Sequence, residues 1–160
     1  MEEQLTVVSS PRKPGMHCQL LASRGRAGSI SVFGGQVARL ACAHGAWFLK
    51  RSPASQRGVT IETADHRQAG RYFPRRVLPG GVISLVDGTE VALRRSRPGR
   101  WKVWSADGRR CLAEVRRSRG RYVRGQELKV TVHSLPTNVQ NASMIILAAC
   151  ALLMLPGEID

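Results

Sequence analysis

The stretch "MIILAACALLML" (residues 144–155) is a run of twelve apolar residues in a chain that is otherwise polar and basic. Twelve helical residues rise about 18 Å, whereas the hydrocarbon core of a bilayer is about 30 Å thick. Extending the run backwards meets Ser143 and Asn141, and Pro156-Gly157 stops it on the other side, with no Lys or Arg close to either end. The stretch is therefore too short for a membrane span.

A helix over this stretch is apolar on every face, so it must be buried on every face. A helix lying in a membrane interface would instead need one charged face. A sheet that closes into a barrel around the helix meets this requirement in a small β protein. The small residues at positions 148–151 would make the middle of the helix thin enough for such a bore.

The preceding residues predict short antiparallel strands. "VTIET" (59–63) alternates apolar and polar residues, which is typical of a strand with one buried and one exposed face. Residues 82–95 and 100–117 each carry an Asp-Gly pair between two alternating runs, and this pattern is typical of β-hairpins. Gly34-Gly35 and Gly80-Gly81 are also predicted as hairpin turns. Residues 36–51 fit either a short helix or two strands, and Gly45 favours the strands.

The predicted fold is mainly β, as a single domain over residues 1–160. It is a closed antiparallel β-barrel of about twelve short strands around a buried hydrophobic C-terminal helix. The strands are expected at about residues 5–134 and the central helix at about 138–155, with Thr137 or Asn138 as its N-cap.

The positive charge is the most distinctive property of the composition. A net charge of +14 comes from 21 arginines and 4 lysines against 11 carboxylates. Guanidinium groups bind phosphates and carboxylates with two hydrogen bonds. A GC-rich genome also raises the content of Arg, Ala and Gly, so the excess has two explanations. Residues 94–124 alone hold eleven arginines and Lys102 against Asp107 and Glu114, a local net charge of +10.

The candidate binding residues for an anion or a lipid headgroup come from this segment: Arg94, Arg95, Arg97, Arg100, Lys102, Trp104, Arg116, Arg117, Arg119, Arg121 and Arg124. They fall in two similar segments, so we expect them to cluster at one end of adjacent hairpins. Strand alternation predicts that Trp101 and Val103 point to one face and Lys102 and Trp104 to the other, so one tryptophan is in the core and the other is on the surface. Such a cluster would bind anionic lipid headgroups or nucleic-acid phosphates. The alternative is a solvated face that prevents edge pairing.

Other chemistry has little support in the sequence. The four cysteines are widely spaced and predict neither a disulfide framework nor a zinc site, which favours a reducing cytosol. The N-terminal residues do not read as a signal peptide. Neither G-x-S-x-G nor H-E-x-x-H occurs. We therefore expect no enzyme activity, no cofactor and no metal.

Two stretches resemble the tubby C-terminal-like superfamily, in its phospholipid scramblase and LURP-one-related branches. "WKVWSADGRRCLAEV" (101–115) resembles paired strands of that barrel, and residues 128–155 resemble its last strand, loop and threaded helix. The resemblance implies a twelve-stranded barrel around a helix, mostly without enzyme activity. Tubby domains are associated with phosphoinositides and scramblases with membrane lipids. The sequence has no cysteine-rich stretch and no acidic calcium loop, so scrambling is not expected.

The function predicted from these features is a non-enzymatic tubby-like barrel, located in the cytoplasm or at the inner face of the membrane. Its Arg-rich loops would bind anionic phospholipid or another polyanion. Two alternatives remain: a nucleic-acid-binding β module, and a structural or protein-interaction barrel with no ionic ligand.

Overall fold

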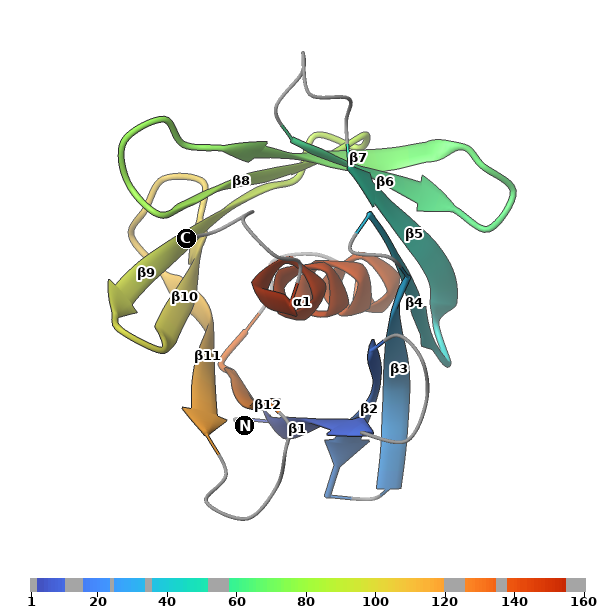
Figure 1. Ribbon diagram of the computed structural model, residues 1–160. Coiled ribbons are helices and arrows are strands. Elements are labelled where there is room, and N and C mark those ends of the chain that lie inside the picture. Colours follow the sequence, from blue (N-terminus) through green and yellow to red (C-terminus); the bar gives the residue numbers. More distant parts are fainter. Residues whose placement is uncertain are drawn as a thin grey trace.

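In the residues that the structure describes, the protein is a closed barrel of twelve antiparallel strands with one helix inside it (Figure 1). The structure, a computed structural model, describes residues 3–10, 16–23, 25–33, 36–51, 58–119, 126–134 and 138–154. Each strand pairs with its neighbours in the chain, and β1 closes the barrel by pairing with β12. The predicted fold class is therefore confirmed.

The first six strands are β1 (Glu3–Ser10), β2 (Met16–Ala22), β3 (Gly25–Phe33), β4 (Val37–Cys42), β5 (Gly45–Arg51) and β6 (Val59–Thr63). The remaining elements are β7 (Gln68–Pro74), β8 (Gly80–Leu85), β9 (Glu90–Arg97), β10 (Arg100–Ser105), β11 (Cys111–Arg119), β12 (Gln126–Val132) and the helix α1 (Val139–Met154). Residues 36–51 form two strands with a turn at 43–44, as Gly45 predicted.

Because every strand turns back beside the one before it, successive turns alternate between the two ends of the barrel. We call one of these the basic end: it carries the β7–β8 turn (75–79), the β9–β10 turn (98–99) and the last residues of α1. The opposite end carries the β6–β7, β8–β9 and β10–β11 turns and the first residues of α1. The backbone topology alone therefore decides which turns come together.

Strand alternation separates a buried face from an exposed one. In β10, Trp101 is 4% exposed and Val103 is buried, whereas Lys102 and Trp104 lie on the outer face and are half-buried. The two tryptophans therefore lie on opposite faces, as the alternation predicted, and Trp101 is the one in the core. Inward-facing side chains from all twelve strands then pack with α1 into one hydrophobic core.

The helix α1 fills the barrel as the apolar run predicted. Asn138 caps it, because the backbone N–H of Asn141 donates to Asn138 Oδ1 over 2.8 Å. From Met144 to Met154 every residue is buried except Ile146, which is half-buried. No helix in the described parts of the chain combines the length and the hydrophobicity that crossing a membrane requires.

The prediction of a turn at Gly80-Gly81 is wrong, because both glycines belong to β8 and the turn lies at residues 75–79. Close packing is the reason for the glycines. Gly80 has a φ of +110°, and a Cβ there would overlap the carbonyl oxygen of Leu93. A Cβ at Gly81 would stand 2.7 Å from Cε2 of the buried Tyr72. Gly34-Gly35 and Pro156-Gly157 lie outside the described residues.

We expect Gly80→Ala to lower the free energy of unfolding by about 2 kcal/mol or more, because it adds both backbone strain and a steric clash. Gly88→Ala is the matched control: its φ is +94°, but open space surrounds the added methyl group. Urea denaturation of both variants would measure the difference. Equal losses would show that backbone strain, and not the contact with Leu93, sets the cost.

The core also holds two thiols, Cys18 and Cys150. Burial raises the pKa of Cys18 to about 11, and burial with the nearby Cys18 raises the pKa of Cys150 to about 12. Since both pKa values are above the unfolded value, these thiols favour folding below about pH 8.5, and this contribution is lost as the pH rises through the folded values.

We expect iodoacetamide at about pH 8 to leave Cys18 and Cys150 unmodified in the native protein, because only exposed thiolates react readily. After unfolding in denaturant, all four cysteines should be alkylated. Peptide mass spectrometry would report each site. Native modification of Cys150 at its unfolded rate would contradict the buried position of α1.

Candidate anion-binding surface

Four cationic residues form one row across the outer face of β9 to β12. Arg97 pairs with Arg100 in the strand register, Arg100 with Arg116, and Arg116 with Lys129. Directly paired residues share a face, with Cβ atoms about 5 Å apart. Arg100 is half-buried and the other three are exposed. We call these four residues the basic row.

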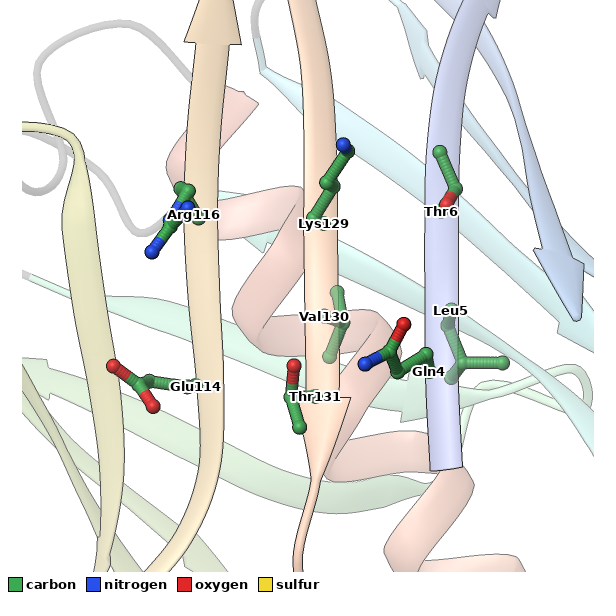
Figure 2. Close-up of a pocket in the computed structure, with 8 residues that line it drawn as sticks. All are labelled: Gln4, Leu5, Thr6, Glu114, Arg116, Lys129, Val130 and Thr131. Carbon is green, nitrogen blue, oxygen red and sulfur yellow. The ribbon is translucent and has the colours of Figure 1, made fainter. Parts of the chain in front are cut away.

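The wall beside the basic row is hollowed into a groove of about 410 Å³, shown in Figure 2. Arg116, Lys129 and Thr6 lie in register along one level of β11, β12 and β1. The next level contains Glu114, Thr131 and Gln4, and the groove floor includes Leu5 and Val130. The groove thus combines two cations with hydroxyl and amide groups that can donate hydrogen bonds.

The basic row is not neutralised by the carboxylates that the structure describes. Arg97, Arg100 and Arg116 form no ion pair with any described carboxylate. Glu114, which lines the groove beside them, instead has its Oε2 3.9 Å from Nε2 of His133. Like charges placed directly opposite each other on a sheet destabilise it. A bound anion would remove this repulsion.

Three other candidates form a second group on the outer face of β9 and β10. Arg94 pairs with Lys102 in the register, and Lys102 Nζ lies 5.9 Å from the ring centroid of Trp104. The Arg94 guanidinium extends towards Gly108 in the β10–β11 turn, 3.9 Å from where a Cβ would stand. These side chains therefore point away from the basic row. Arg95 is exposed on β9 beside Trp101.

Arg117 faces into the barrel instead. Its Nη2 donates to the carbonyl oxygen of Leu153 in the last turn of α1, and its backbone N–H donates to the Gly99 carbonyl over 2.7 Å. A cation at a helix C-terminus stabilises the helix through its dipole. Of the remaining candidates, Arg119 belongs to β11 but its side chain is not described, and Arg121 and Arg124 lie outside the described residues.

The exposed apolar turn between β7 and β8, close to the arginines of β9, was not predicted from the sequence. Val77 is 91% exposed and Leu78 is 61% exposed in the β7–β8 turn, directly after Arg75 and Arg76. The turn reaches the arginines of β9 because Gly80 pairs with Arg94. The sequence pattern that indicates it is a pair of aliphatic residues between Arg75-Arg76 and Pro79-Gly80.

Carboxylates in turns gather at the opposite end of the barrel. Asp65, Asp87 and Asp107 lie in the β6–β7, β8–β9 and β10–β11 turns, which all face that way. Hydrogen bonds within each turn lower the carboxyl pKa, chiefly from the Thr63 side chain, the Thr89 backbone N–H and the Ser105 side chain, respectively. The three carboxylates are therefore ionised at neutral pH, and they lie at the other end of the barrel from the basic row.

No group of three metal-ligating side chains occurs among the residues that the structure describes. His17 and Cys18 point apart, since His17 lies against Ser31 with 3.0 Å between Nδ1 and Oγ, while Cys18 is in the core. Comparisons with protein-family models, curated proteins and solved structures find no match to this chain.

Proposed function

We propose that this chain is a non-enzymatic, tubby-like barrel protein that binds anionic phospholipid membranes as a peripheral protein on their cytoplasmic face. The observation that carries the proposal is the combination of the basic row with the exposed Val77-Leu78 turn at one end of the barrel. Cations and exposed aliphatic side chains at the same end of the barrel match the two layers of a membrane surface.

The two parts contribute in different ways. Each Lys or Arg near an anionic membrane contributes about 1 kcal/mol, so the four residues of the basic row supply about 4 kcal/mol at low salt. This attraction weakens with ionic strength. Burial of Val77 and Leu78 among the acyl chains does not depend on charge, so it supports binding at higher salt.

Membranes fit this surface better than nucleic acid does. A nucleic acid would also be attracted to the basic row, with a strong dependence on salt. Single strands, however, bind by stacking bases on exposed aromatic rings. On the strand of Arg100, Trp101 is only 4% exposed, and Trp104 on the outer face is half-buried beside Lys102. The exposed apolar side chains of the β7–β8 turn are aliphatic. The aromatic just before that turn, Phe73, is 47% exposed, but the Arg71 guanidinium lies over its ring, 5.2 Å from the centroid.

Flotation with lipid vesicles tests the proposal. We expect the protein to float with phosphatidylserine-containing vesicles and not with pure phosphatidylcholine vesicles, and to bind less at high salt. Equal flotation with both vesicles would overturn the proposal. Fluorescence anisotropy with labelled oligonucleotides serves as the comparison: tight, salt-sensitive binding there without any vesicle preference would instead support the nucleic-acid alternative.

The apolar turn has a control of its own. Val77→Ser/Leu78→Ser should reduce vesicle binding and make the remainder more sensitive to salt. Val86→Ser should have no effect, because Val86 is 70% exposed but lies in the β8–β9 turn at the opposite end. Equal losses in both proteins would mean that general surface hydrophobicity drives the binding.

A further inference from the structure

The opposite end of the barrel contains a second cavity, of about 530 Å³, between α1 and the strands β1 to β4. On the helix side, the cavity is lined by one face of α1, from Val139 to Ile146 and Leu147. Its strand side includes Leu5 and Leu20. Ile146 is the one residue between Met144 and Met154 that is not fully buried, and it is half-exposed because it lines this space.

The cavity has the size and the floor of a small-molecule site. Ligand pockets usually measure about 300–1,000 Å³ and have apolar walls with a few polar groups. Here the floor is aliphatic, and Ala27 and Ala142 keep the space open because their side chains are small. An unbranched hydrocarbon chain fits such a space, which is bounded by a helix and a sheet.

The polar groups lie at the mouth of the cavity. Arg26 at the start of β3 and His44 in the β4–β5 turn are exposed neighbours, since β3 pairs with β4 and Gly28 lies opposite Cys42. Glu3 also lines the mouth, but it is the first residue of β1, which β2 separates from Arg26 on β3. Arg26 forms no ion pair with a carboxylate in the described part of the chain. The first turn of α1, with the positive end of its dipole, is at the same mouth.

We propose that this cavity binds an aliphatic carboxylate, a molecule of the fatty-acid class. The hydrocarbon chain lies along Ile146 and Leu147 against Leu20, and the carboxylate is held at the mouth by Arg26 beside His44. The site is separate from the basic row, because the two are at different ends of the barrel.

Calorimetric titration of the whole protein with decanoate tests this proposal. We expect one decanoate per chain and a raised melting temperature, because the ligand binds only the folded state. Decyltrimethylammonium, with the same chain length and the opposite charge, should not bind in the cavity. Absence of saturable decanoate binding, or equal binding of both compounds, would overturn the proposal.

Variants then locate the site. Arg26→Gln should weaken decanoate binding about tenfold, which is typical for the loss of a charge-assisted hydrogen bond. Arg109→Gln removes an exposed arginine at the same end that does not line the cavity, so its binding should equal that of wild type. An equal loss in both variants would show that decanoate only follows the net charge.

Filling the cavity gives the independent test. Ala142→Phe should abolish binding, because the ring occupies the space beside Ile146. If that variant fails to fold, Val139→Trp replaces it, since Val139 lines the mouth but is largely exposed in the first helical turn. Wild-type affinity in a folded variant would overturn the proposal. Vesicle flotation of Arg26→Gln should match wild type, so this proposal and the membrane proposal can fail separately.

Discussion

Ala149→Arg is expected to unfold the domain completely. Ala149 is 1% exposed in the middle of α1, where the barrel wall surrounds the helix. Transferring an unpaired charge into such an interior costs more than the free energy of unfolding of a typical domain, which is about 5–15 kcal/mol. Circular dichroism should show loss of the native strand signal, and the protein should aggregate or lose its cooperative thermal transition.

Gln140→Arg provides the control for this prediction. Gln140 is exposed in the first turn of the same helix, so the added charge stays in water and the melting temperature should change little. If Ala149→Arg remained folded with a normal thermal transition, α1 could not lie in the barrel, and residues 144–155 would need another environment.

The second large effect concerns the basic row. Replacing Arg97, Arg100 and Arg116 together by Gln is expected to weaken binding to phosphatidylserine-containing vesicles about a hundredfold at low salt. Three charges at about 1 kcal/mol each give this factor. These side chains are exposed or half-buried on the outer face, so the fold should be retained. Vesicle co-sedimentation over a range of lipid concentrations would give the partition coefficients.

A variant with the same change in net charge separates a specific surface from general attraction. Arg67, Arg109 and Arg110 are exposed arginines at the opposite end of the barrel. Their triple replacement by Gln should reduce binding only slightly, because those charges would face away from the membrane. If both triple variants lost binding equally, the net charge of +14 and not the basic row would cause it.

The barrel and its helix could be predicted because their signals are local. Alternation in "VTIET" and the Asp-Gly pairs at 87–88 and 107–108 fix strands and hairpins within a few residues. The apolar run at 144–155 then supplies the one long-range constraint. A helix without a polar face needs a wall on all sides, and a meander of short strands provides it only by closing.

The candidate site could be predicted only in part, because neighbouring residues on a strand face opposite ways. Arg116 belongs to the basic row, while Arg117 supports the end of α1 inside the barrel. The irregularity between Arg100 and Trp101 sets which arginine of β9 faces the row, and no sequence pattern marks it. The second cavity depends on how closely α1 approaches β1 to β4, which only the assembled structure defines.

The pairing of β1 with β12 has a consequence for folding. The first and last strands are separated by nearly the whole sheet in the sequence. Contacts between residues so distant in sequence slow folding. The helix that fills the barrel follows all twelve strands in the chain. While the ribosome makes the protein, the strands therefore emerge before the element they must enclose. During that interval their apolar faces are exposed to aggregation, and chaperones that bind extended apolar segments would protect them.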